Sequence, residues 1–138
     1  MERVALYMRK STEVQPWDNQ KDVLDKYVAD HADMQVVGEY CDVGSGSKVL
    51  PDMQKLLEDA EKDVFDTVLV ASLDRLGRDP HLLTEVFRVF MKCGVSFADI
   101  SSNFVDTRTV DGRKFANMLV CFTNWVRPEE EMGKEGEE

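Results

Sequence analysis

The stretch that decides the fold is VALYMRKST, residues 4–12, where an apolar run changes abruptly into charged and hydroxyl residues. Residues 4–8 fit a strand that is buried on both faces. A second apolar run, residues 67–72, leads into LDRLGRD, residues 73–79. The carboxyl ends of parallel strands lie at one edge of a sheet, and open α/β sheets bind their ligands at that edge. We therefore expect the two polar segments to lie at the same edge.

Strands and helices alternate along the rest of the chain. Apolar runs predict strands, and apolar residues repeating every three to four positions predict helices. The strands are expected at residues 4–9, 34–40, 67–72 and 95–100, and the helices at residues 18–31, 51–60, 81–93 and 111–127. This alternation predicts an α/β fold with a mainly parallel sheet, flanked by helices in flavodoxin-like layers.

Composition limits the organisation and the partners of the chain. Residues 1–127 are expected to form one domain, and residues 128–138, with six glutamates against one lysine, an acidic and disordered tail. The formal net charge of −10 repels DNA at long range, so any DNA affinity has to come mainly from another domain. Three cysteines without Cys-x-x-Cys spacing indicate a cytoplasmic protein with reduced thiols, and no apolar run is long enough to cross a membrane.

Ser11 is the candidate nucleophile for phosphodiester chemistry without a metal or cofactor. Arg9, Arg75 and Arg78 are predicted to hold the phosphate, because a guanidinium binds two oxygens at once and stays charged at any working pH. The two histidines are isolated, which excludes a Ser-His-Asp triad and most zinc sites. A serine after a strand is nevertheless more often a turn or cap residue, and neighbouring Asp and Arg residues are often only surface ion pairs.

Three motifs in this order resemble the catalytic domain of the serine recombinases, the resolvase and invertase family. The strand-end Tyr-x-Arg-x-Ser-Thr covers residues 7–12, Asp-x-x-Ser-Gly covers residues 42–46, and Asp-Arg-Leu-Gly-Arg-Asp covers residues 74–79. The resemblance runs over about residues 4–127 and leaves no room for the family's DNA-binding domain. It implies site-specific DNA strand cleavage and religation through a covalent 5′-phosphoserine at Ser11. Agreement of three ordered motifs by chance is far rarer than agreement of one.

The resemblance also assigns further residues and partners. Asp42 and Asp74 match acidic positions near the family's site, where each would orient an arginine or carry a proton to the leaving oxygen. Gln15 and Gln20 match two glutamines that would position the loop around the serine. The helix over residues 111–127 matches the family's dimerisation helix, so we expect a homodimer or tetramer, with double-stranded DNA bound mainly through a domain absent from this chain.

One departure from the family pattern concerns the phosphate-binding residues. Family members carry an arginine shortly after Ser-Gly, often before a proline, whereas this chain has Leu50-Pro51 there and Lys48 as the nearest cation. Reduced activity is expected unless Lys48 replaces the arginine as a point charge. The alternative is a cleavage-impaired dimerisation module, and a weaker one is a flavodoxin-like ligand-binding domain. Residues 44–48 do not form a phosphate loop, because Ser47 separates Gly46 from Lys48.

Overall fold

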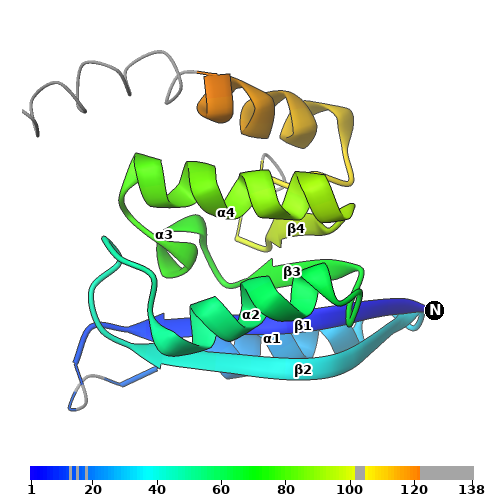
Figure 1. Cartoon of the computed structure of the whole chain (residues 1–138). Coiled ribbons are helices and arrows are strands. Elements are labelled where there is room, and N and C mark those ends of the chain that lie inside the picture. Colours follow the sequence, from blue (N-terminus) through cyan, green and yellow to red (C-terminus); the bar gives the residue numbers. More distant parts are fainter. Residues whose placement is uncertain (13, 15, 18, 102–104, 122–138) are drawn as a thin grey trace, which may run out of the picture.

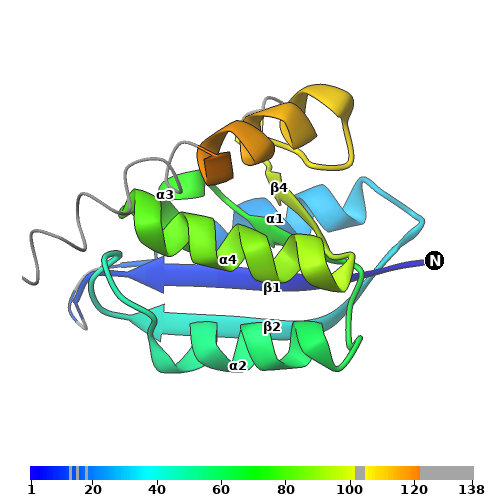
Figure 2. The same cartoon turned by 45° about the horizontal axis from the view of Figure 1, so that its top comes forward.

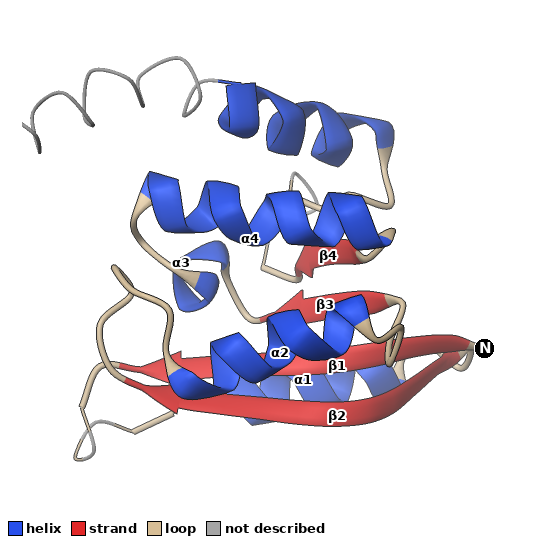
Figure 3. Ribbon diagram, in the orientation of Figure 1, coloured by secondary structure: helices blue, strands red, loops and turns tan. Residues whose placement is uncertain are grey.

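The computed structural model of the chain describes residues 1–12, 14, 16–17, 19–101 and 105–121 (Figure 1). In order along the chain, the elements are β1 (Glu2–Lys10), α1 (Gln20–Ala29), β2 (Met34–Val43), α2 (Pro51–Glu61), β3 (Thr67–Val70), α3 (Leu73–Leu76), α4 (Pro80–Cys93) and β4 (Ser96–Asp99). A further helical stretch covers residues 110–121. The alternation of strands and helices predicted from the sequence is confirmed (Figure 3). The short helix α3 was not expected.

The four strands form one parallel sheet in the order β2-β1-β3-β4. β1 pairs with β2 along its whole length, but with β3 only at Val4–Leu6. The strand order changes direction between β1 and β3, because β2 lies on one side of β1 while β3 and β4 lie on the other. In open α/β sheets, the carboxyl ends at such a reversal border the ligand-binding crevice.

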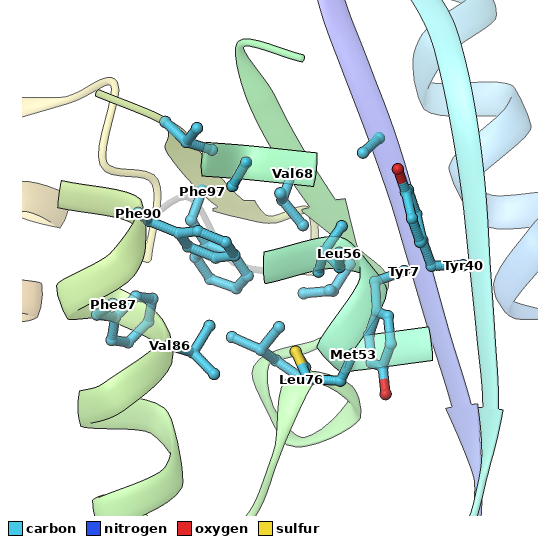
Figure 4. Close-up of a cluster of buried hydrophobic side chains, with 14 of the residues drawn as sticks. Tyr7, Tyr40, Met53, Leu56, Val68, Leu76, Val86, Phe87, Phe90 and Phe97 are labelled. Carbon is cyan, nitrogen blue, oxygen red and sulfur yellow. The ribbon is translucent and has the colours of Figure 1, made fainter. Parts of the chain in front are cut away.

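Helices cover both faces of the sheet, which explains why residues 4–8 are apolar without alternation. On one face, Val4, Leu6 and Met8 pack with Leu24 of α1. On the other face, Ala5 and Tyr7 belong to a larger cluster with α2 and α4, shown in Figure 4. In Figure 2, α1 lies behind the sheet and α4 lies in front of it. Burying each large apolar side chain contributes about 1.5–3 kcal/mol, so this packing holds the helices against both faces of the sheet.

The segment after β4 covers the outer edge of the sheet. The backbone N–H of Thr107 donates to the Phe97 carbonyl at 2.8 Å, and Ala98 forms an antiparallel bridge with Asp106. A Cβ on Gly112 would lie only 1.9 Å from the Asp106 carbonyl oxygen, so only glycine fits where the helical stretch begins. Shielding an edge strand in this way prevents it from pairing with other chains.

The helical stretch over residues 110–121 lies beside α4 (Figure 1). Its partly buried Phe115, Leu119 and Val120 pack against the larger cluster. The helix predicted at residues 111–127 is therefore confirmed as far as residue 121. Residues 122–127 and the tail predicted at 128–138 lie outside the described residues. None of the described helices is long and apolar enough to cross a membrane.

Candidate active site

Ser11 and the arginine turn, which we define as residues 73–78, follow the two central strands of the sheet. Ser11 comes directly after β1 and is exposed to solvent. The arginine turn begins three residues after β3 and contains α3, with Arg75 half-buried and Arg78 exposed. Because β1 and β3 are parallel neighbours, the expectation that both segments lie at one edge of the sheet is confirmed.

Arg9 is at the centre of this edge and is only 2% exposed. Its Nη1 donates to the Gly44 carbonyl at 2.9 Å, its Nη2 to the Asp74 carbonyl at 2.8 Å, and its Nε to the Arg75 carbonyl at 3.3 Å. The guanidinium thus joins β1 to the β2–α2 loop and to α3. Burial, followed by the positive charges of Arg78 and Arg75, lowers the pKa of Arg9. Phosphate binding by Arg9 stays a prediction, and it would compete with these carbonyls.

Gln20 holds the backbone of Arg9 from the first turn of α1. Its Oε1 accepts from the Arg9 N–H at 3.2 Å, and its Nε2 donates to the Arg9 carbonyl at 2.9 Å. Pairing of β1 with β3 ends at Leu6, so this buried amide satisfies backbone groups that β3 does not reach. Gln20 is therefore well placed to steady the strand end before Ser11, and that role in catalysis remains a prediction. Gln15 lies outside the described residues.

Asp42, at the end of β2, is buried and bound from two sides. Its Oδ2 accepts from the Tyr7 hydroxyl at 2.7 Å and from the Met53 N–H at 2.8 Å, and its Oδ1 accepts from the Asp52 N–H at 2.8 Å. Asp42 thus caps α2, whose own N-cap residue, Leu50, offers no side-chain acceptor. Burial and the bond to Asp42 raise the pKa of Tyr7, which keeps the phenol a donor. The proton-carrying role of Asp42 stays a prediction.

Tyr7 was not singled out as a functional residue, because in the sequence it belongs to an apolar run. Its hydroxyl nevertheless links β1 to Asp42 and, through Asp42, to α2. A signal was present in the sequence, since a tyrosine inside a buried strand usually needs a hydrogen-bond partner for its hydroxyl. The identity of that partner was not deducible.

The glycine of the Asp-x-x-Ser-Gly motif brings the β2–α2 loop against the arginine turn. The Gly46 carbonyl accepts from the Arg78 N–H at 2.8 Å. A Cβ on Gly46 would lie 3.0 Å from Arg9 Nη2 and 3.1 Å from the Arg78 nitrogen, so any larger residue would push the two segments apart. The motif therefore has a packing reason that the sequence alone did not show.

Asp74 and Lys48, two further candidates, are both exposed to solvent. The Asp74 carboxylate accepts from the Ser72 hydroxyl, and its carbonyl binds Arg9. Lys48 is exposed in the β2–α2 loop. In the same loop, the Ser45 hydroxyl lies 2.7 Å from that of Ser47.

Leu50, where the sequence predicts that the family's arginine is missing, belongs to the protein interior. It is 7% exposed, and its side chain is so close to Gly44 that a Cβ there would meet it at 2.8 Å. Leu50 is therefore a packing residue in this structure, and the loss of a phosphate-binding cation there stays a prediction. Among the described residues, no three His, Cys, Asp or Glu side chains are grouped closely enough to hold a metal ion.

Comparisons with known proteins agree with this geometry. The family model described as "Resolvase, N terminal domain" matches residues 4–133. The resolvase of transposon Tn552 from Staphylococcus aureus is 31% identical over 123 residues, which cover 88% of this chain and 58% of that protein. This chain therefore spans little more than half the length of that curated relative.

Two solved structures are similar to this chain over nearly its whole length. The N-terminal catalytic domain of TP901-1 integrase superposes with a TM-score of 0.80 and 38% identity, covering 94% of this chain and 99% of that one. A resolvase family site-specific recombinase from Streptococcus pneumoniae has a TM-score of 0.74 at 23% identity, covering 99% and 95%, and supports the fold alone. With its family-model match, its parallel β2-β1-β3-β4 sheet and its three motifs in order, the chain belongs to the resolvase N-terminal domain family, the catalytic domain of the site-specific serine recombinases.

Proposed function

We propose that this chain cleaves and rejoins DNA strands through a phosphoserine at Ser11. The observation that carries the proposal is the parallel pairing of β1 with β3, because it brings an exposed serine and the arginine turn to the edge where the strand order reverses. In the cleavage step, the Ser11 oxygen forms a bond to phosphorus and the bond from phosphorus to the 3′ oxygen breaks. The serine loses a proton, and the departing 3′ oxygen gains one. Rejoining is the reverse, so the bond energy is conserved.

Arg75 and Arg78 are the proposed phosphate ligands for this step. Negative charge gathers on the nonbridging phosphate oxygens in the transition state, and fixed guanidinium groups stabilise it. The lowered pKa of Arg9 supports this assignment, because after burial the positive charges of Arg78 and Arg75 are causes of the shift. Such a concentration of positive charge favours an anion at this edge of an otherwise acidic protein.

The test uses the full chain fused to a DNA-binding domain of known site, with a nicked suicide substrate that traps the covalent product. The wild-type protein should form a protein–DNA adduct, and Ser11→Ala should form none while unfolding at the same temperature. Ser96→Ala is the matched control, because it makes the same change at the first residue of β4, on the opposite edge of the sheet. An adduct in Ser11→Ala would move the nucleophile to another hydroxyl. No adduct in the wild-type protein would favour the cleavage-impaired dimerisation module.

Reduced activity is proposed from the absence of the family's arginine. If Lys48 replaces it, Lys48→Ala should lower the cleavage rate of the same fusion by about 10²- to 10³-fold. Leu50→Arg should raise the rate, provided that the new guanidinium can leave the buried position of Leu50. An unaffected Lys48→Ala together with an inert Leu50→Arg would leave the arginines as the complete set of phosphate ligands.

Self-association through the helical stretch over residues 110–121 is proposed as the route to a dimer or tetramer. Its Val110 and Met118 side chains are 57% and 64% exposed, and exposed apolar side chains support a partner surface. Met118→Glu should lower the sedimentation coefficient of the chain at high concentration. Lys114→Glu, also exposed on this stretch, is the control for the added charge.

A further inference from the structure

Local hydrogen bonds alone do not hold the arginine turn in place. Its helix α3 is only four residues long, and helices of that length do not form on their own in water. The residue before it, Ser72, is the N-cap, yet its side chain makes no capping bond and donates to the Asp74 carboxylate instead. The first N–H group of α3 therefore needs an acceptor from another part of the chain.

Asp99 supplies that acceptor from the end of β4. It pairs with Val70 in the sheet ladder, so it lies beside the point where β3 leads toward the arginine turn. Its Oδ2 accepts from the Leu73 N–H at 2.8 Å. Its Oδ1 accepts from the N–H and the hydroxyl of Ser101 at 2.8 and 2.6 Å. Asp99 is 6% exposed, and these bonds hold its carboxylate in one orientation.

A positively charged side chain, that of Arg9, binds the other end of α3. The Arg9 guanidinium binds the carbonyls of Asp74 and Arg75, and the Gly46 carbonyl binds the N–H of Arg78. A buried carboxylate thus binds the amide at the start of the turn, and a buried guanidinium binds carbonyls near its end. Both are charge-assisted bonds, which are about twice as strong as neutral ones.

We propose that Asp99 is a positioning residue for Arg75 and Arg78. By fixing the Leu73 N–H, it sets the direction in which the arginine turn leaves β3, and hence where the two guanidinium groups meet the phosphate. The inference rests on the proposed cleavage function of these arginines. Neither the three sequence motifs nor the candidate site residues include Asp99, which reaches the site only through the backbone of α3.

The experiment compares Asp99→Ala and Asp99→Asn in the full-chain fusion, at saturating DNA and well below the melting temperature of each variant. Asp99→Ala should lower the single-turnover rate of adduct formation about 100-fold, the usual effect of a displacement near 1 Å, and leave DNA affinity unchanged. Asp99→Asn should recover most of the rate, because an amide oxygen still accepts from Leu73. Asp66→Ala is the control, since that carboxylate also accepts a backbone N–H, from Arg3 at 2.9 Å, at the opposite edge of the sheet.

Amide hydrogen exchange of Leu73, followed by NMR, tests the anchor without any cleavage. The Leu73 N–H should be protected in the wild-type chain and in Asp99→Asn, and should exchange rapidly in Asp99→Ala. Unchanged protection in Asp99→Ala would overturn the anchor, and lost protection with a wild-type cleavage rate would overturn the positioning role. If the wild-type chain and Ser11→Ala are equally inactive, the proposed function fails, and the exchange result still decides whether Asp99 holds the turn.

Discussion

The two edges of the sheet use their arginines differently. At the amino edge, Arg3 pairs with Asp63 and Asp66, and Arg108 pairs with Asp106 and Glu2. At the carboxyl edge, Arg9 binds only carbonyl oxygens, and no carboxylate in the described part of the chain pairs with Arg9 or Arg78. A carboxylate cancels the charge of the arginine that it binds, whereas neutral carbonyl oxygens leave that charge uncompensated. The contrast teaches that both edges hold the fold, but only the carboxyl edge leaves the charge of its arginines uncompensated by carboxylates, which fits the proposed binding of an anion there.

The pKa shifts of the arginines also differ between the two edges. At the amino edge, the hydrogen bond that Arg108 donates to Asp106 raises the pKa of Arg108, although burial opposes this shift. At the carboxyl edge, burial and like charges lower the pKa of Arg9. Stabilising partners therefore surround the charges at one edge, and destabilising neighbours surround them at the other. A bound phosphate would offset the like charges around Arg9 at the carboxyl edge.

The largest effect is expected from Arg9→Met. The substitution keeps apolar volume but leaves the carbonyls of Gly44, Asp74 and Arg75 without their donor. A buried polar group that loses its partner costs about 1–3 kcal/mol, so the free energy of unfolding should fall by about 3 kcal/mol or more. Urea unfolding measures this change in the free energy of unfolding. Arg88→Met, which removes an ion pair to Glu85 on α4, is the control and should cost less than about 1 kcal/mol. Similar losses in the two variants would break the comparison.

Arg78→Ala should slow adduct formation without changing the stability of the fold. Its side chain is exposed, so the free energy of unfolding should change by no more than about 0.5 kcal/mol. Loss of a transition-state donor should slow adduct formation by about 10²- to 10³-fold in the fusion. Arg3→Ala is the converse, with a small loss of stability and an unchanged rate of adduct formation. A normal rate in Arg78→Ala would remove this residue from the phosphate-binding set.

The smallest effect concerns acid stability at the amino edge. Hydrogen bonds from Arg3 lower the pKa of Asp66 below its usual value near 3.9. A carboxyl group with a lower pKa in the folded state stabilises the protein above its unfolded pKa, and this contribution disappears as the pH falls through the folded value. Asp66→Asn should therefore destabilise the chain at pH 6 and much less at pH 3. The difference should stay below about 1 kcal/mol, because the pair is about half exposed. Equal losses at both pH values would contradict the shift.

The sequence predicted the architecture well, because buried strands leave a visible pattern. The run over residues 4–8 and the run over residues 67–72 became adjacent parallel strands, and the two polar segments after them lie at one edge. The helix α3 was missed because four residues cannot show a helical period. Its stability comes from Asp99 and Arg9, which lie far from it in the sequence.

The sequence could not show which groups the side chains of the site bind. Arg9 was assigned to phosphate on the basis of its guanidinium, but in the structure this group binds backbone carbonyls, which every residue carries. Asp42 was expected to orient an arginine or carry a proton, which stays a prediction, and the sequence did not show that it binds Tyr7 and the first amides of α2. A residue type indicates which bonds a side chain can make, whereas the fold decides which of them it does make.

The long sequence separation of the bonds around Arg9 has a consequence for the folding of the chain. Arg9 binds residues that lie 35, 65 and 66 positions away, and Asp99 reaches back 26 positions to Leu73. Contacts between such distant residues form late, since each requires a long loop to close first. A chain emerging from the ribosome therefore cannot assemble the cluster before β3, α3 and β4 have been synthesised. Partly folded molecules therefore lack the ordered arginine turn.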